Sequence, residues 1–279
     1  MSKWQRFLPK LPQHKYAIQA KLLGDDRALA WTNLGDWSVL SPCGSKPSYP
    51  QACESLAHGL AQALTLNSKD RVLDLGCGQG ASLQLWQQHY AVQNLEAVEL
   101  QTACVQQIQQ HLPHLNAIHE LDFLNLNQFE FKSFDVVMCL DAAYHTNLNS
   151  FLTSVKSVLN SKARIGFHTL IWSDEYLNSN FFSKQRYHFL LKAADVNSRD
   201  VLTQVQLEQT LKSENFVNIQ IQDLSEAVLK GFADYVEHDL VQDLSGVDGL
   251  KIAMTAKLCR KLYKDGLLRY VQVTAHQGI

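Results

Sequence analysis

One stretch of nine residues constrains the fold of this chain more than any other. It covers residues 72–80 and reads Val-Leu-Asp-Leu-Gly-Cys-Gly-Gln-Gly, and a helical pattern follows from Ala81. A short apolar run, a glycine-rich turn and a helical pattern predict a buried strand, a tight turn and a helix N-terminus. Glycine has no Cβ, so such a turn can take backbone angles that side chains disfavour and can approach a ligand closely. The stretch predicts an α/β fold with a candidate ligand site at this turn.

Two classes of cofactor use a loop of this kind. Dinucleotide-binding proteins carry G-x-G-x-x-G and place the pyrophosphate at the helix N-terminus. Here the pattern is D-x-G-x-G-x-G, with Asp74 before Gly76, Gly78 and Gly80. The P-loop pattern G-x-x-x-x-G-K-[ST] is absent, so the loop has no lysine for gripping phosphate. A tight turn with no ligand is the alternative interpretation of the glycines alone.

The full stretch closely resembles motif I of the class I S-adenosylmethionine (SAM) methyltransferases, in their small-molecule, type 11-like branch. The resemblance implies a Rossmann-like, seven-stranded, mostly parallel sheet with strand seven antiparallel, helices on both faces and helical cap or lid insertions. It implies that SAM binds at the carboxyl ends of the strands and leaves as S-adenosylhomocysteine. The cofactor-binding residues that it implies around motif I are Asp74, Gly76, Cys77, Gly78 and Gly80.

A second acidic residue follows motif I at the spacing of a βαβ unit. The next expected strand covers 95–100 and ends on Glu99 and Leu100, about 20 residues after Gly76. A carboxylate at this point accepts hydrogen bonds from both ribose hydroxyls of a cofactor. NAD and SAM proteins share this acid, so Glu99 does not distinguish them, and a solvated glutamate is the alternative. Leu100 is assigned to the cofactor site by the resemblance.

The resemblance assigns two further segments to the cofactor. Asp122 and Phe123 follow the third expected strand, over 116–119, where the family uses an acid for the adenine amine and a neighbour to cover the ring. The segment 32–37 resembles the N-L-G-x-W sequence that precedes the family's core, which places Trp37 over the cofactor pocket. A surface turn with a buried tryptophan is the alternative for Trp37.

The fourth expected strand carries the candidate catalytic residues. It covers 134–140 as a continuous apolar run, which is typical of a buried parallel strand. The resemblance implies that the end of this strand faces both cofactor and substrate. It assigns Leu140 to the cofactor site, and Asp141, Tyr144 and His145 become the candidate catalytic residues. Methyl transfer mainly requires alignment of the reactants, and a base helps a hydroxyl or phenol nucleophile. His145 is the predicted base because histidine titrates near neutral pH, with Asp141 as its orienting partner.

Other residues narrow the chemistry. His168, in the fifth expected strand over 164–171, is a second candidate base, although either histidine can be purely structural. The family's tetrapeptide [DNS]-P-P-[YF], which marks methylation of amide or base nitrogens, is absent after the fourth strand. This argues against DNA adenine and glutamine methylation. The Asp/Asn arrangement of magnesium-dependent catechol methyltransferases is not evident either, so we predict no metal.

The rest of the chain is expected to build around this core. We predict an N-terminal arm and cap helix over 1–48 and a SAM-binding domain over 49–279. Helical insertions are expected at about 172–203 and 225–264. The first of them contains a helical pattern over 181–194, which we interpret as a lid over the substrate pocket.

Composition limits the partners. The formal net charge is −2, so nothing indicates nucleic acid as a required partner, because phosphate binding needs a basic face. The expected helix over 248–264 has an apolar line with lysines and arginines on its other faces. Such a helix can contact a membrane peripherally, although it is more often a solvated face. We expect a small-molecule substrate.

The compartment is predicted from the cysteines and from the apolar runs. The 6 cysteines are scattered without a C-x-x-C pair, which is typical of reduced thiols in a cytoplasmic protein. We find neither the pattern of a signal peptide nor a run of about 18 apolar residues. The prediction is therefore a cytoplasmic protein.

These patterns predict a SAM-dependent methyltransferase that acts on an O, N or C nucleophile of a small, partly apolar molecule. An RNA or other macromolecular methyltransferase is the main alternative among enzymes. A non-catalytic SAM-fold binding protein is a second alternative, against which the intact acids and glycines argue. An NAD-dependent oxidoreductase is a third, and the absence of a Tyr-x-x-x-Lys catalytic set counts against it.

Overall fold

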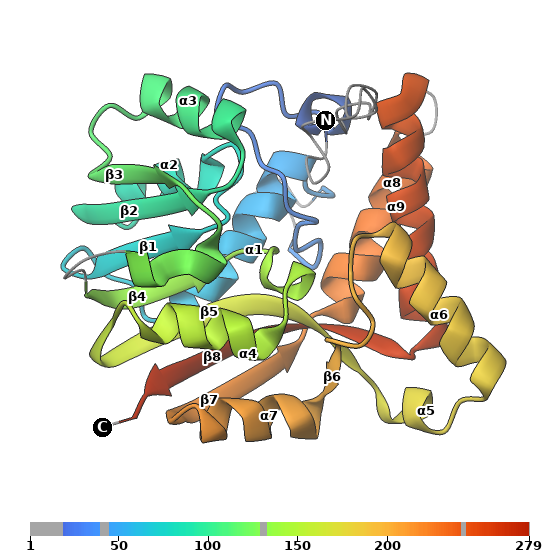
Figure 1. Ribbon diagram of the computed structural model, residues 1–279. Coiled ribbons are helices and arrows are strands. Elements are labelled where there is room, and N and C mark those ends of the chain that lie inside the picture. The colour runs from blue at the N-terminus through green and yellow to red at the C-terminus, as the bar shows by residue number, and fades with distance from the viewer. Residues whose placement is uncertain (1–18, 40–44, 129–132, 241–243, 279) are drawn as a thin grey trace, which may run out of the picture.

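The computed structural model describes residues 19–39, 45–128, 133–240 and 244–278, and its centre is one mixed sheet (Figure 1). The strand order is β3-β2-β1-β4-β5-β8-β7, with β6 pairing with β5 off this path. The strands are β1 (Arg71–Leu75), β2 (Asn94–Glu99), β3 (Ala117–Glu120), β4 (Phe134–Cys139), β5 (Leu159–Trp172), β6 (Leu202–Thr203), β7 (Phe216–Asp223) and β8 (Leu268–Gln277). All neighbours pair in parallel except β8, which is antiparallel to β5 and β7. The predicted Rossmann-like sheet with an antiparallel last strand is confirmed.

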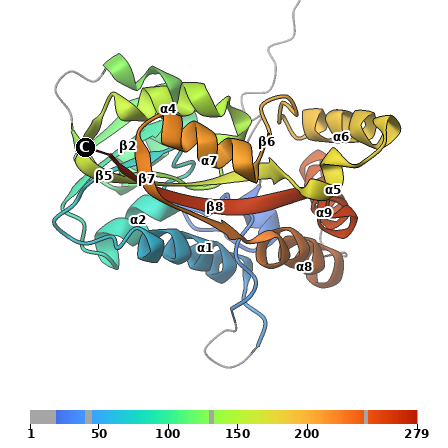
Figure 2. The same ribbon diagram turned by 90° about the horizontal axis from the view of Figure 1, so that it is seen from below.

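Helices cover both faces of this sheet. The α-helices are α1 (Tyr49–Ala63), α2 (Ala81–Gln88), α3 (Thr102–His111), α4 (Leu148–Lys156), α5 (Asp174–Leu177), α6 (Phe181–Ala193), α7 (Gln204–Ser213), α8 (Gly231–Asp239) and α9 (Gly246–Asp265). Short helical turns are η1 (Ala20–Leu23), η2 (Phe123–Gln128), η3 (Ala143–His145) and the π-turn η4 (Glu226–Lys230). Figure 2 shows α1, α2 and α8 on one side of the sheet and α4 and α7 on the other.

Successive side chains of the central strands point to opposite faces of the sheet, so the hydrophobic core consists of two clusters, one on each face. Val72 packs into the cluster that contains α1, α2, α8 and α9, whereas Leu73 and Leu75 pack into the cluster that contains α4 and α7. In β4, Val136 joins the first cluster and Val137 joins the second. Because both faces are buried, these strands are continuous apolar runs, and this is the pattern that made them predictable.

Most predicted elements agree with the structure, and the differences are local. β1 covers Arg71–Leu75, so the buried strand predicted at the start of the stretch 72–80 is confirmed. β5 begins at Leu159, before the predicted start at Arg164, and accommodates the extra length with an irregular pairing to β4. The two-residue β6 was not predicted, because it is too short to carry a periodic pattern. Within the N-terminal arm and cap helix predicted over 1–48, the structure describes only one helical element, the short turn η1, and residues 1–18 and 40–44 lie outside the described residues.

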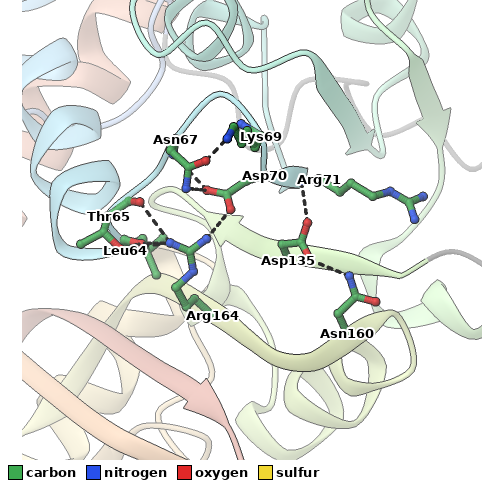
Figure 3. A network of polar contacts seen from close by, with 9 residues as sticks. All are labelled: Leu64, Thr65, Asn67, Lys69, Asp70, Arg71, Asp135, Asn160 and Arg164. Carbon is green, nitrogen blue, oxygen red and sulfur yellow. Dashed lines mark hydrogen bonds and ion pairs between the residues drawn. The ribbon is translucent and has the colours of Figure 1, made fainter.

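A polar network fixes the amino ends of β1, β4 and β5 (Figure 3). Arg164 pairs with Asp70 and also donates to the carbonyl oxygen of Leu64 at 2.6 Å. Asp70 accepts from the backbone and side-chain nitrogens of Asn67, both at 2.9 Å. The network holds the strand ends opposite to those where motif I lies, so it supports the site without forming part of it.

Candidate functional site

The glycine-rich loop leaves β1 where the sheet order reverses. The chain runs from β1 outwards to β2 and β3 and then returns to β4 on the other side of β1. In open α/β sheets, ligands bind at the carboxyl ends of the strands at such a switch point. The loop is anchored by the backbone nitrogen of Gly76, which donates to the carbonyl oxygen of Val98 at 2.8 Å. Gly80 then caps the N-terminus of α2 in the left-handed conformation.

A cavity opens beside this loop. Its lining comes from motif I, the start of α2, the end of β4 and the N-terminal segment, namely Ala30, Trp31, Thr32, Asn33, Gly76, Cys77, Ala81, Ser82 and Leu140. Of the residues that the sequence assigned to the cofactor, the cavity brings together Gly76, Cys77 and Leu140. Asn33 belongs to the segment 32–37 that the resemblance assigned to the cofactor, although only Trp37 was named there. Trp31 was not predicted, and no periodic pattern marks it.

The N-terminal segment lies directly on the loop. Gly78 has a φ of +56°, and a Cβ added there would lie 2.6 Å from the hydroxyl oxygen of Thr32. Only glycine fits at this point, for conformational and steric reasons together. The segment is held by Asp25, which accepts from the backbone nitrogen of Trp31 at 2.8 Å and forms a bidentate pair with Arg27.

Asp74 is completely buried under the loop. Its Oδ2 accepts from Ser82 Oγ at 2.7 Å and from Trp86 Nε1 at 2.8 Å. Its Oδ1 is buried with no hydrogen-bond partner among the described residues. Burial raises the pKa of this carboxyl to about 6. A buried acceptor without a donor is costly, so this oxygen fits a ligand that brings a donor or a positive charge.

Glu99 joins the loop to the second strand. Its two carboxylate oxygens accept from the backbone nitrogens of Gly78 and Gln101, each at 2.9 Å. Burial raises its pKa. The side-chain oxygen of Gln101 is also buried without a partner among the described residues. Hydroxyl donors, such as those of a ribose, would suit both residues.

The other predicted adenine and ribose contacts lie around the same edge. Phe123 packs on the loop, because a Cβ added at Gly76 would lie 3.6 Å from its ring. Asp122 accepts from the backbone nitrogen of Leu124 at 2.9 Å, which fixes the turn. Leu100 is 58% exposed at the end of β2, so it can cover a ligand only from outside.

Trp37 lies elsewhere than over this cavity. Its ring stacks on Tyr235 with 4.4 Å between centroids, and its Nε1 donates to the carbonyl oxygen of Leu34 at 2.8 Å. It also packs on the start of α8, where a Cβ added at Gly231 would come within 2.4 Å of it. The cavity is instead lined by Trp31.

The loop after β4 gathers polar groups around Asp141. This carboxylate accepts from the hydroxyl of Tyr270 at 2.8 Å and from the backbone nitrogen of Leu34 at 3.0 Å. The hydroxyl of Tyr144 is a third hydrogen-bond partner. Burial nevertheless raises the pKa of Asp141 to about 6. The backbone of Asp141 has a φ of +57°, which its carboxylate contacts help to hold.

The two candidate histidines differ in their surroundings. His145 Nδ1 donates to the carbonyl oxygen of Asp195 at 3.1 Å, which leaves the lone pair of the neutral ring on Nε2. His168 is fully buried, and its ring stacks on Tyr270 with 5.5 Å between centroids. Burial lowers the pKa of His168 to about 4, so this ring is neutral at physiological pH. Tyr270 itself was not predicted, because it comes from the last strand.

Metal and membrane features are also tested by the described residues. They contain no group of three or more His, Cys, Asp or Glu residues that could hold a metal ion. None of the helices in the described ranges combines the length and apolar character that a membrane-spanning segment needs.

Comparison with solved structures places the fold. A geranyl diphosphate methyltransferase in complex with GPP and sinefungin is 17% identical, with a TM-score of 0.70, and 95% of this chain and 96% of that chain are covered. Mycolic acid cyclopropane synthase CmaA1, complexed with SAH and CTAB, is 14% identical with a TM-score of 0.71, and 96% of this chain and 99% of that chain are covered. The [4+2]-cyclase SpnF is 16% identical with a TM-score of 0.68, and the coverage is 94% and 92%. Identities this low show the fold alone.

Comparison of sequences matches one part of the chain to a family model. No curated protein matches the chain. Residues 73–167, from motif I to β5, match the family model of the methyltransferase domain. This region carries motif I, Glu99 and the loop after β4, and it includes Asp74 and Gln101, whose buried side-chain oxygens have no partner among the described residues. Residues 73–167 therefore form a methyltransferase domain of the class I type, whose members use SAM as methyl donor.

Proposed function

We propose that the protein transfers the methyl group of SAM to an O, N or C nucleophile of a small, partly apolar molecule. The observation that carries this proposal is the cluster around Asp141, which stands at the carboxyl end of β4 next to Leu140 in the cavity wall. A carboxylate, two phenols and a histidine lie together there, beside the cavity that we assign to the cofactor.

The cofactor half of the site is assigned to Asp74, Glu99 and the glycine-rich loop. SAM supplies a methyl group on a positively charged sulfur, and its amino and ribose groups are hydrogen-bond donors. The unpartnered Asp74 Oδ1 and the Glu99 carboxylate match these donors in charge and in hydrogen-bonding type. Asp122 and Phe123 would hold the adenine at the outer edge. The segment with Thr32 covers the loop and would exclude water from the reacting atoms.

The acceptor half is assigned to the loop after β4. His145 presents Nε2 as the basic nitrogen and can take a proton from an acceptor hydroxyl. Asp141 and Tyr144 would orient a polar group of the acceptor. The ring of Tyr144 is only partly buried and packs against the buried ring of Tyr270 with 6.5 Å between centroids. Tyr144 can therefore offer aromatic surface to an apolar body.

Charge pairing supports a small acceptor over an RNA. Arg260 pairs with Asp234 and Glu237, and Lys261 pairs with Asp265. These pairs neutralise two of the cations of the basic helix α9. A phosphate backbone would need those cations unpaired.

Titration calorimetry tests the cofactor assignment first. SAM and S-adenosylhomocysteine are titrated into the purified protein, with NAD as the control ligand. We expect both sulfur compounds to bind, and we expect Asp74→Ala and Glu99→Ala to weaken that binding. Binding of NAD alone, or of none of the three, would overturn the proposal.

A transfer assay then tests the acceptor class. Labelled SAM is offered with prenyl diphosphates, unsaturated fatty acids, phenols and small amines, and with total RNA as the macromolecular competitor. Label in one of the small partly apolar molecules supports the proposal. Label in RNA alone would establish the macromolecular alternative in its place.

A further inference from the structure

Three phenylalanines stand out on the surface of α6. Phe181 is 68% exposed, Phe182 is 82% exposed and Phe189 is 67% exposed. Leu177, at the end of the preceding helix α5, is 53% exposed. Scattered apolar residues on a surface are ordinary, but neighbouring large side chains exposed to this degree mark an interaction site.

Two of the rings share one face of the helix, because Phe182 and Phe189 are separated by two helical turns. The ring of Phe181 contacts that of Phe182, with 6.0 Å between centroids. The opposite face holds α6 on the molecule, where Tyr187 and Leu191 are buried and the Tyr187 hydroxyl donates to Asp265 at 2.9 Å. The exposed face is therefore not the packing face of the helix.

Cations lie among the rings. α6 contains Lys184, Arg186 and Lys192 and no Asp or Glu, in a chain whose formal net charge is −2. Arg186 follows Phe182 by one turn and precedes Phe189 by one turn, and Lys192 is also exposed. Neither makes an ion pair with a carboxylate among the described residues. We call Leu177, Phe181, Phe182, Arg186, Phe189 and Lys192 the α6 face.

The position of α6 leaves this face accessible. In Figures 1 and 2, α5 and α6 lie at the side of the molecule far from β2 and β3, outside the helices that cover the sheet. The residues of the α6 face line none of the described cavities. Exposed aromatic rings with cations among them suit the boundary of an anionic lipid phase.

We infer that the α6 face docks the protein onto an anionic lipid surface. Aromatic rings bury readily at the boundary between headgroups and acyl chains, and lysine and arginine beside them are attracted to anionic headgroups. The basic helix predicted for such a contact, α9, is a weaker candidate, because Arg260 and Lys261 are paired with carboxylates.

The segment that follows α6 links this helix to the candidate site. It carries Asp195, whose carbonyl oxygen accepts from His145. Because α6 is also the helix predicted as a lid over 181–194, a partly apolar acceptor dissolved in lipid would then enter beside it. This last step rests on the proposed function, whereas docking itself does not.

Sedimentation with vesicles tests the inference without cofactor or acceptor. The full chain is mixed with vesicles of phosphatidylcholine and phosphatidylglycerol, and with vesicles of phosphatidylcholine alone. We expect binding to the anionic vesicles that weakens as salt is added. Phe182→Ser with Phe189→Ser should weaken binding by about 10-fold or more, because burial of each ring is lost. Arg186→Gln with Lys192→Gln should weaken binding to anionic vesicles by about 10-fold or more.

The matched control is on α9. Leu250 is 61% exposed and Met254 is 58% exposed, so Leu250→Ser with Met254→Ser removes a similar exposed pair. We expect this variant to bind as the unaltered protein does. Absence of binding, equal binding by the phenylalanine variant, or an equal loss in the α9 variant would overturn the inference.

Two further measurements keep the outcomes separate. Gel filtration shows whether the rings instead hold a second copy: a dimer that the phenylalanine variant converts to monomer would overturn lipid docking. SAM titration into the same variants confirms that they are folded. A protein that binds vesicles but not SAM would contradict the proposed function and leave docking intact. A protein that binds SAM but not vesicles would overturn docking and leave the proposed function intact.

Discussion

The hydroxyl of Tyr270 donates to Asp141 Oδ1 at 2.8 Å and thereby joins the last strand of the sheet to the loop after β4. The two residues are 129 positions apart in the chain. Asp141 also accepts from the backbone of Leu34. One carboxylate therefore connects the N-terminal segment, the central strand and the C-terminal strand.

Replacement of Tyr270 by phenylalanine should weaken this connection. Tyr270→Phe removes one donor from a buried carboxylate, so we expect the free energy of unfolding to fall by about 1.5–3 kcal/mol, measured by urea denaturation. The pKa of Asp141 should rise further, because this hydrogen bond lowers it. Tyr90→Phe is the control, since the Tyr90 hydroxyl contacts His58, away from Asp141. Equal losses of unfolding free energy in the two variants would mean that the hydrogen bond to Asp141 stabilises the fold no more than that between Tyr90 and His58.

Asp74→Asn should separate cofactor binding from folding. The amide oxygen of asparagine can still accept from Ser82 and Trp86, so we expect the melting temperature to change little. The amide nitrogen would replace the unpartnered oxygen with a donor, and the negative charge would be lost. We expect SAM binding to weaken by about 10-fold or more in calorimetry, as for loss of a charged hydrogen bond. Unchanged affinity for SAM would show that Asp74 only stabilises the glycine-rich loop and does not contact the cofactor.

The raised pKa values of Asp74 and Asp141 predict a pH dependence with a definite sign. Both are raised from 3.8 to about 6 in the folded protein, so the folded state binds protons more tightly than the unfolded state. Their contribution to stability is fully present below pH 3.8 and is lost as the pH rises through about 6.

Asp141→Asn isolates this effect. The difference in unfolding free energy between the unaltered protein and the variant should decline from about pH 4 to about pH 6 and then level off. Denaturation in matched buffers across that range gives the comparison. A difference that stays constant with pH would show that Asp141 titrates normally in the folded protein.

Replacement of His145 should affect turnover far more than cofactor binding. If the acceptor is a hydroxyl or phenol, we expect His145→Ala to lower kcat by about 100-fold or more, because general bases contribute at this level. His145→Asn is the informative companion, since its amide can still donate to the carbonyl oxygen of Asp195 but cannot take up a proton. Full activity in the asparagine variant would leave His145 with a positioning role only.

Arg164 should matter for stability and not for binding. Arg164→Ala leaves Asp70 buried without its cationic partner, so we expect a loss of about 3–5 kcal/mol in unfolding free energy. Arg71→Ala is the control, because its side chain is exposed and lies over the Phe134 ring at 5.8 Å. It should cost about 1 kcal/mol or less. SAM affinity of the folded Arg164 variant should be unchanged, since this network is at the other end of the strands.

The sequence predicted the parts of the molecule whose patterns are local. β1 and motif I are adjacent in the chain, and burial on both faces makes the central strands apolar runs, so their bounds and their order along the chain could be read directly. Asp141, Tyr144 and His145 follow β4, and their proximity was predictable for the same reason.

Contacts between distant segments could not be predicted in this way. Tyr270 reaches Asp141 only because β8 inserts between β5 and β7, and no spacing in a single sequence encodes that pairing. Trp37 was expected over the cofactor, yet its ring stacks on Tyr235 of α8, while Trp31 lines the cavity. Two tryptophans six positions apart in an irregular segment give no period from which to choose between them.

The late position of β8 has a consequence for biosynthesis. A ribosome makes the chain from its N-terminus, so Asp141 emerges 129 residues before the tyrosine that completes its hydrogen bonds. At ordinary rates of translation that interval lasts roughly 6–26 s. From the completion of β5 until β8 is made, one edge of β5 has no partner strand. The nascent protein then carries an open sheet edge and an unfinished candidate loop together, and a single closing strand removes both.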